Sequence, residues 1–305
     1  MGEPILDAHV HLWDPAHLDY GWLSGSLDHR FDASRLREVA GDAQHIVVEA
    51  DCAPSQRLDE VDWIAGMGAE ASIVGIVACA PLEHGDRVRS HLAALRSRPL
   101  VVGVRRLLQG APAGFATTPD FITGARAVSE AGLAFDACVH EHGLGDIIDL
   151  ADAVPDLRIV LDHLGKPPVG TRSNPREPSD LWRARLRELA ARPNVWAKLS
   201  GLPAEAGEPG SWDAATVRPF LDEALTAFGA DRLLFGSDWP VSQPAVRWRD
   251  VVATWAREQG EDVHAAVMAG TARHVYRVGR SRSDDIPPST SMNVPVVDPD
   301  EGLTR

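Results

Sequence analysis

Eight short apolar runs rich in β-branched residues recur along the 305-residue chain, and stretches with helical periodicity separate most of them. Continuous apolar runs of this length are typical of parallel strands that are buried on both faces. The predicted strands are 5–11, 45–50, 72–78, 100–107, 134–140, 158–165, 194–201 and 232–238. Eight alternating strand–helix units predict an α/β fold, a closed (β/α)8 TIM barrel.

The stretches between the predicted strands carry helical signals. In 213–228 the apolar residues recur on one helical face, and Asp213 precedes them as a candidate N-cap. Similar patterns predict helices over 55–67 and 180–191. A doubly wound sheet is the rival fold, but no glycine-rich phosphate loop follows the first strand.

The barrel is expected to be a single domain. The chain has no internal repeat and no linker that would divide it, and its length suits one large barrel. We therefore place the barrel at 1–278. Residues 279–305 lack helical periodicity and are predicted to form a disordered tail.

Composition excludes several classes of partner. The formal net charge of −14 argues against nonspecific binding to nucleic acid or to an anionic membrane surface. No apolar run approaches the ~18 residues of a membrane span, and no export signal is recognised at the start. The chain has three cysteines without CxxC spacing, which argues against a disulfide framework and favours a reduced, cytoplasmic setting.

Reactive side chains gather where the predicted strands end. In a barrel of this kind the chemistry takes place at the carboxyl ends of the strands. The chain has only two lysines, Lys166 and Lys198, and both lie at such ends. The other residues of this set are His9, His11, Glu49, Arg105, Arg106, His140, His142, Asp162, His163, Ser200, Ser237 and Asp238. The pattern predicts one shared site.

The segment ILDAHVHLWD contributes two histidines to this site. The strand period of two places Asp7, His9 and His11 on one face, here the barrel interior. Two imidazoles on successive same-face positions, about 7 Å apart along the backbone, can converge on one ion. Alternatively, one or both histidines can cover the end of the hydrophobic core and form hydrogen bonds there. Glu49, together with His163 and Asp238, favours a shared site but leaves the presence of a metal open.

Two further residues are candidates for the chemical step. A carboxylate that leaves an apolar strand needs a cation, a metal or a proton, and Asp238 in FGSDWP can take a proton from water. Its structural alternative is an N-cap for the following helix. His163 in LDHLGKP can polarise a carbonyl or ligate a metal, and its alternative is a buried histidine with satisfied hydrogen bonds.

Basic and aromatic residues suggest how a substrate is held. Arg105 and Lys166 belong to a positive cluster in an acidic protein, which suits a carboxylated or polyhydroxylated substrate or a developing oxyanion. Strand alternation predicts that either Arg105 or Arg106 points outward and is structural. Trp13 and Trp239 are candidate stacking walls for a sugar, with packing as the alternative.

The motifs LDAHVHLWDP, GVRRLLQ, GLAFDACVHEHGL, VLDHLGKPPV, NVWAKLSGL and FGADRLLFGSDWPV resemble those of a known family. They are similar to the sugar-lactonase group of the amidohydrolase superfamily (amidohydrolase-related family 2), whose members include enzymes like L-fuconolactonase and L-rhamnonolactonase. The motifs follow the family order from residue 5 to about 278. Glu49 departs from the pattern, because relatives commonly carry Gln there.

The resemblance implies a (β/α)8 barrel that hydrolyses a cyclic ester of a small sugar acid. It assigns Asp238 as the general base and His163 as an electrophile that acts directly or through a divalent metal. Zinc is the first candidate for the metal, with ligands from the set His9, His11, Glu49 and Asp238. Arg105, Lys166 and a histidine in EHGL, His142, would hold substrate oxygens. Metal-dependent decarboxylation of an aromatic or unsaturated acid is the alternative reaction in the same superfamily.

Overall fold

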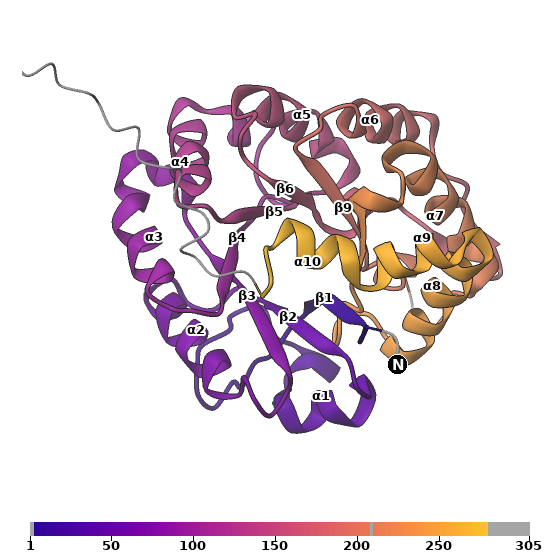
Figure 1. Cartoon of the computed structure of the whole chain (residues 1–305), viewed down its shortest axis with the longest axis horizontal. Helices are drawn as coiled ribbons and strands as arrows, with labels where there is room; N and C mark the ends of the chain where they lie inside the picture. The colour runs from indigo at the N-terminus through magenta and orange to yellow at the C-terminus, as the bar shows by residue number, and fades with distance from the viewer. Residues whose placement is uncertain (1–2, 208–209, 280–305) are drawn as a thin grey trace, which may run out of the picture.

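A parallel β-barrel forms the centre of the protein (Figure 1). The computed structural model describes residues 3–207 and 210–279. Its eight-stranded sheet has the order β1-β2-β3-β4-β5-β6-β9-β10, and every pair of neighbours is parallel. The strands are β1 Leu6–Val10, β2 Gln44–Val48, β3 Ile73–Cys79, β4 Val101–Leu107, β5 Ala134–Cys138, β6 Ile159–Leu161, β9 Val195–Leu199 and β10 Leu233–Phe235. The short strands β7 Gly170–Thr171 and β8 Asn174–Pro175 form a separate hairpin in the loop after β6.

One helix follows each barrel strand and covers the outside of the sheet (Figure 1). These helices are α1 Ala33–Ala40, α2 Arg57–Gly66, α3 Val88–Arg96, α4 Pro119–Glu130, α5 Leu144–Ala153, α6 Asp180–Ala190, α7 Ala214–Phe228 and α8 Ala245–Gln259. Asp213 caps α7, since its Oδ1 accepts a hydrogen bond from the Thr216 backbone N–H at 3.0 Å. The predicted (β/α)8 barrel and this N-cap are therefore confirmed.

The segment after β10 closes the barrel against β1. The backbone N–H of His11 donates to the carbonyl of Trp239, and that of Asp238 donates to the carbonyl of His9, both at 2.7 Å. These two hydrogen bonds pair the backbone around His9 and His11 with the backbone around Asp238. Closure of the barrel thus brings the two ends of the sequence-predicted site together.

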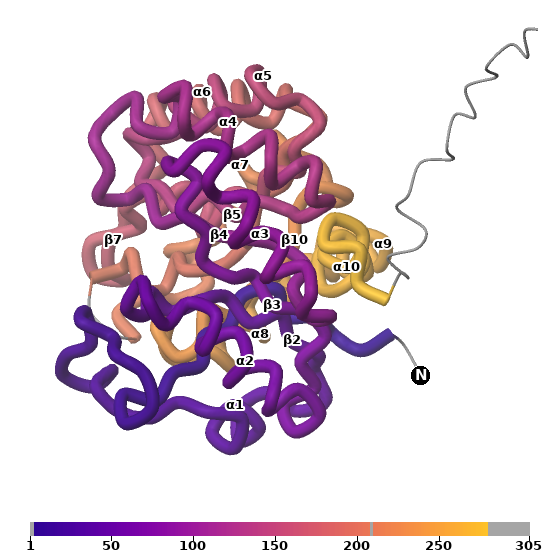
Figure 2. Tube along the Cα trace, turned by 90° about the vertical axis from the view of Figure 1, so that its left-hand side faces the viewer, coloured from indigo at the N-terminus to yellow at the C-terminus, as the bar shows by residue number. Residues whose placement is uncertain are grey.

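The short helix α10 (Thr271–Val275) closes the amino-terminal end of the barrel. It follows α9 (Glu261–Ala265) and a π-helical turn, Ala266–Gly270. Ala272 and Val275 of α10 pack with residues at the barrel centre such as Leu6 and Ala8. Figure 2 shows α10 at one end of the molecule and the β7 hairpin near the other. The open end is therefore the one at which the strands terminate.

A β-bulge in β1 overturns one part of the predicted side-chain arrangement. Between the pairs Asp7–His45 and Val10–Val47, β1 has one residue more than β2. This extra residue reverses the alternation, so Leu6 and Ala8 face the barrel centre while Asp7 lies on the opposite face. Asp7 accepts a hydrogen bond there from the Ser237 backbone N–H at 2.8 Å. The expectation that Asp7 shares a face with His9 and His11 was wrong.

Six barrel strands end earlier than their apolar patterns predict, and the difference is largest at β6 and β10. The predicted strand 158–165 stops at Leu161, and Asp162–Gly165 forms a tight turn instead. Likewise β10 stops at Phe235 and β5 at Cys138. The polar residues that continue these patterns turn out of the sheet toward the open end of the barrel, so the errors fall at the ends that carry the chemistry.

Other expectations can be compared with the described part of the chain. No helix within residues 3–207 and 210–279 is long and apolar enough to cross a membrane. Cys52, Cys79 and Cys138 are buried free thiols. The tail predicted at 279–305 lies outside the described residues except for Gly279.

The packing of α4 against the loop after β3 gives a test of the fold. A Cβ added at Gly124 in α4 would overlap the carbonyl oxygen of Leu82, whereas a Cβ at Gly145 in α5 meets nothing within 4 Å. We expect Gly124→Ala to lower the free energy of unfolding by about 1–3 kcal/mol through overpacking. Gly145→Ala should leave it unchanged or raise it by up to ~1 kcal/mol. Urea denaturation of both variants measures the difference, and equal stabilities would contradict this packing.

Candidate active site

A cavity of about 220 Å³ opens at the carboxyl ends of the strands. It lies where predicted site residues from different strands converge. Its walls are formed by His11, Trp22, Ala50, Asp51, Arg105, Leu107, Gln109, Cys138, His163, Lys166, Gly201, Ala204, Glu205, Asp238 and Val241. Five residues named from the sequence, His11, Arg105, His163, Lys166 and Asp238, are therefore brought together in one cavity.

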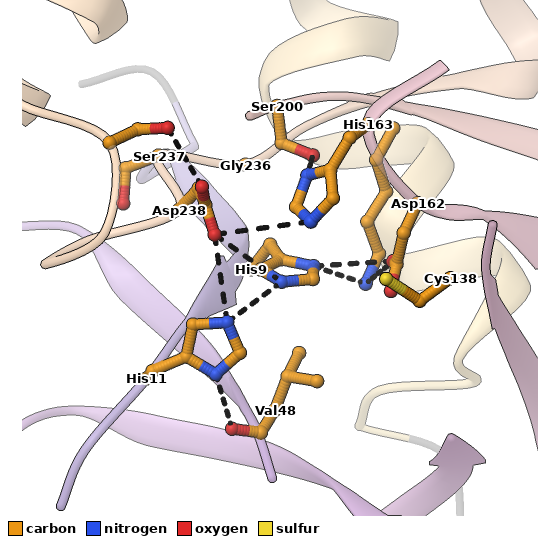
Figure 3. A network of polar contacts seen from close by, with 12 residues as sticks. His9, His11, Val48, Cys138, Asp162, His163, Ser200, Gly236, Ser237 and Asp238 are labelled. Carbon is orange, nitrogen blue, oxygen red and sulfur yellow. Dashed lines mark hydrogen bonds and ion pairs between the residues drawn. The ribbon is translucent and has the colours of Figure 1, made fainter. Parts of the chain in front are cut away.

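The Asp238 carboxylate lies on the wall of this cavity and faces three imidazoles, of which those of His11 and His163 also line the wall (Figure 3). Its Oδ1 lies 3.7 Å from His9 Nε2, 3.6 Å from His11 Nε2 and 4.0 Å from His163 Nε2. His9 Nε2 and His11 Nε2 are 3.1 Å apart. All four side chains are nearly fully buried. The arrangement places one carboxylate oxygen and three imidazole nitrogens around a common point.

Strained backbone conformations position several residues of the cavity. Asp51, His163, Lys166 and Asp238 all adopt positive φ angles between 51° and 57°. Left-handed backbone costs a residue with a Cβ roughly 1–2 kcal/mol, so the surrounding fold must hold each of them there. In this conformation each residue leaves the strand direction at its carboxyl end. The sequence pattern extended β6 and β10 through His163 and Asp238, and the positive φ angles explain why the strands end before them.

Neighbouring side chains fix the protonation states of Asp238 and His163. Burial raises the pKa of the Asp238 carboxyl, but the His163 and His11 imidazoles outweigh it, so this pKa lies below its ordinary value. Ser242 Oγ also donates a hydrogen bond to Asp238 Oδ2 at 2.7 Å. Burial lowers the pKa of the His163 imidazole to about 4. At neutral pH, therefore, Asp238 is ionised and His163 is neutral.

A buried cluster of charges lies beneath the histidines. Lys198 Nζ is 2.5 Å from Asp136 Oδ2 and 3.0 Å from Asp162 Oδ1, and all three residues are fully buried. Tyr276, which follows α10, donates its O–H to Asp136 at 2.7 Å. Burial opposes the charge on Lys198, but the two carboxylates raise its pKa above the ordinary value. Lys198 is thus a charged donor at the centre of the barrel.

This cluster controls which nitrogen of His9 carries the proton. Lys198 Nζ lies 2.9 Å from His9 Nδ1, and Asp162 Oδ1 lies 3.3 Å from the same nitrogen. An ammonium group only donates, so its hydrogen bond requires an unprotonated Nδ1 and leaves the proton on Nε2. A hydrogen bond from Nδ1 to Asp162 instead frees the Nε2 lone pair. The two partners therefore decide whether His9 presents a donor or a ligand to the cavity.

The donor set fits a divalent cation. His9, His11 and Asp238 offer two nitrogens and one oxygen that lie within 4.8 Å of one another, and His9, Asp162 and His163 offer a second such group. Two imidazoles on one tetrahedral zinc ion have nitrogens about 3.3 Å apart, close to the 3.1 Å observed here. Within the described residues neither oxygen of Asp162 accepts a well-formed hydrogen bond, so this carboxylate can orient His9.

Glu49 is bound to Arg105 rather than directed at this donor set. Arg105 Nε donates to Glu49 Oε1 at 2.6 Å, and Arg105 Nη2 donates to the Glu49 backbone carbonyl at 2.7 Å. The neighbouring Arg106 points the other way and pairs with Glu83 at 2.8 Å. The expectation that one of the two arginines faces outward is confirmed. Glu49 is not among the carboxylates that converge with the histidines within the described part of the chain.

Three predicted substrate contacts do not line the cavity. Trp13 is fully buried, and its Nε1 donates to the carbonyls of Leu27 and His29, so it holds the loop after β1 together. Trp239 is also buried and packs edge to face against Phe31. His142 is exposed and stacks on His140 outside the cavity. These corrections share a cause, because sequence position at a strand end does not determine the direction of the side chain.

Sequence reasoning missed several residues of the cavity wall. Trp22 supplies the aromatic wall, and its Nε1 donates to the Ala50 carbonyl at 2.7 Å. Gln109 accepts a hydrogen bond from Lys166 Nζ at 2.6 Å. Asp51 and Glu205 add two carboxylates. Asp51 directly follows the predicted strand 45–50, and Gln109 lies two residues after the predicted strand 100–107, so both could have been selected. Trp22 and Glu205 belong to loops that carry no such signal.

The fold and the site define a barrel enzyme whose reactive groups lie at the carboxyl ends of its strands. The chain belongs to the amidohydrolase family, whose model matches residues 6–278. It is 33% identical over 294 residues to L-fucono-1,5-lactonase from Burkholderia ambifaria, covering 92% of this chain and 97% of that protein. It is 24% identical over 333 residues to L-rhamnono-gamma-lactonase from Scheffersomyces stipitis, covering 90% and 98%.

A solved structure shows the same similarity in three dimensions. The crystal structure of an amidohydrolase from Burkholderia multivorans with bound zinc superimposes with a TM-score of 0.78 at 30% identity. The superposition covers 90% of this chain and all of that one. The family expected from the sequence motifs is thereby confirmed.

Proposed function

We propose that the enzyme hydrolyses a sugar-acid lactone, an aldonolactone such as L-fucono- or L-rhamnonolactone, by attack of water on the ester carbonyl. The observation that carries the proposal is the ionised Asp238 carboxylate on the wall of a small cavity, with one imidazole nitrogen from each of three histidines within 4.0 Å of its Oδ1. Two relatives that share the length of this chain are named as sugar lactonases, which supports the same reaction here.

Asp238 is proposed to act as the general base. A carboxylate oxygen accepts a proton from water while the water oxygen forms a bond to the carbonyl carbon of the lactone. The ring C–O bond then breaks, and the protonated Asp238 returns its proton to the ring oxygen. Water and lactone give one hydroxy acid. Ser242 donates a hydrogen bond to Oδ2 and orients the carboxylate, whose Oδ1 faces the three imidazoles.

Other residues of the cavity are proposed to bind and polarise the substrate. The neutral His163 ring is oriented by a contact of 2.8 Å between Nδ1 and Ser200 Oγ, and its Nε2 faces the site. It can donate to the carbonyl oxygen, where negative charge develops during attack. Arg105 and Lys166 lie on the cavity wall and can hold ring or side-chain oxygens.

We propose zinc as the bound cation, held by His9, His11 and Asp238. Their donor atoms are those that zinc prefers, and their spacing fits a single ion. When bound, the ion supplies Lewis acidity for the carbonyl and lowers the pKa of water.

Replacing Asp238 tests the general base. Asp238→Asn should lower kcat for L-fucono-1,5-lactone by at least about 10²-fold, because the amide cannot accept the proton of water. Asp231→Asn is the matched control, since Asp231 is exposed at the other end of β10. Acid release under pH-stat conditions measures both. Full activity in Asp238→Asn would refute the role, and release of carbon dioxide from an aromatic acid without any lactone turnover would favour the decarboxylase alternative.

Metal content tests the proposed ligands without relying on activity. Protein purified from zinc-supplemented medium should hold about one zinc ion per chain by elemental analysis. His11→Gln should lose most of it, whereas the exposed His17→Gln should retain it. A zinc content that is the same in both variants would contradict this assignment, and dialysis against a chelator should lower wild-type turnover together with the zinc content.

A further inference from the structure

The ion pair between Glu49 and Arg105 carries an inference about substrate charge. We infer that Glu49 makes the site selective for uncharged lactones over lactones that carry a carboxylate, because it cancels the charge of Arg105 from behind the cavity wall. The inference rests on the proposed function and names the substrate class of the same site. Glu49 thus acts as a positioning and charge-balancing residue and does not itself touch the substrate.

Contacts and burial place Glu49 behind Arg105. Arg105 lines the cavity, whereas Glu49 is 1% exposed and does not line it. Arg105 gives two of its N–H groups to Glu49, at 2.6 Å to the carboxylate and 2.7 Å to the backbone carbonyl. Its Nη1 lies 3.6 Å from Asp162 Oδ2, so a second carboxylate also faces the guanidinium. Arg105 therefore offers hydrogen-bond donors to the cavity while Glu49 balances its positive charge, and Asp162, which Arg105 shares with Lys198, lies nearby.

The other charged residues of the cavity wall also disfavour a substrate that carries a carboxylate. Asp51, Glu205 and Asp238 place three carboxylates on it, against the cations Arg105 and Lys166. Burial, and after it the nearby Glu49, raises the pKa of the Asp51 carboxyl. Apart from the proposed zinc ion, whose charge is the same in every variant, a substrate carboxylate would lose its hydration without gaining an unbalanced side-chain partner. Hydroxyl groups can donate to the same carboxylates and accept from Arg105 and Lys166.

The chain contains a matched pair outside the cavity. Arg106 is the next residue of β4 and forms the same kind of ion pair with Glu83. Neither Arg106 nor Glu83 lines the cavity. Removing the charge of Glu83 therefore changes the net charge of the protein by the same amount as removing that of Glu49, but at a distance from the substrate.

The test compares two lactones that differ in charge. L-Fucono-1,5-lactone is uncharged, and galactaro-1,5-lactone has a carboxylate in place of its methyl group. The measured quantity is the ratio of kcat/KM for the uncharged over the charged lactone, with zinc in excess. Because both substrates are assayed on the same preparation, the ratio does not depend on the fraction of active enzyme. The charge of a bound ion is the same in every variant and therefore cancels from the comparison between variants.

Glu49→Gln should shift this ratio about tenfold toward the charged lactone, the size expected for one charge near a partly shielded site. The shift should appear mainly in KM, since the substrate carboxylate is bound equally in the ground and transition states. The Gln amide oxygen can still accept from Arg105 Nε, so the geometry is kept. Glu49→Asp keeps the charge and should retain the wild-type ratio, and Glu83→Gln should also retain it.

The possible results distinguish the role of Glu49 from the proposed hydrolysis of lactones. An unchanged ratio in Glu49→Gln, with the uncharged lactone still hydrolysed, would overturn the role of Glu49 and leave the proposed function standing. An equal shift in Glu83→Gln would also overturn it, because net charge alone would then explain the effect. Hydrolysis of neither lactone by the wild-type enzyme would refute the proposed function itself for this pair.

Discussion

The buried carboxylate of Asp162 connects the barrel to its chemistry. It lies 3.0 Å from Lys198 Nζ, 3.3 Å from His9 Nδ1 and 3.6 Å from Arg105 Nη1, and these partners come from β9, β1 and β4. Removing one partner of such a buried pair typically costs about 3–5 kcal/mol, because an uncompensated charge remains. The cluster therefore links three strands of the barrel and determines which nitrogen of His9 carries the proton.

The open end of the barrel is organised around this cluster. Lys198 and Asp162 determine the tautomer of His9, and His9 in turn faces Asp238 together with His11 and His163. Asp162 also shares Arg105 with Glu49, which links the charge of the cavity wall to the same network. The chemical centre and the proposed selectivity for uncharged substrates thus depend on one set of buried charges. We therefore expect a substitution in this network to affect both the chemical centre and the selectivity for uncharged substrates.

Much of this arrangement follows from the sequence for physical reasons. Continuous apolar strands that alternate with amphipathic helices leave few folds other than a parallel barrel, and the barrel brings residues at strand ends together. That is why His11, Arg105, His163, Lys166 and Asp238 could be named in advance and are found on one cavity. The motifs of the family added the reaction class.

The rest depends on features that leave little trace in sequence. One extra residue in β1 moves Asp7 to the outer face, and no composition signal marks such a bulge. Trp13 and Trp239 occupy the expected positions but turn into the packing, while Trp22 in a long loop forms the wall. The direction of Glu49 toward Arg105 depends on β2 and β4, which are not adjacent in the sheet because β3 lies between them.

The central claim is that Asp238 takes a proton from a water molecule that attacks the carbonyl carbon of a lactone. The most direct measurement is hydrolysis of L-fucono-1,5-lactone in water enriched in oxygen-18, with the product analysed by mass spectrometry after brief turnover. The account predicts one labelled oxygen in the carboxylate of the hydroxy acid and none in its hydroxyl groups. Label in the hydroxyl that formed the ring would show cleavage at the alkyl carbon and would contradict it.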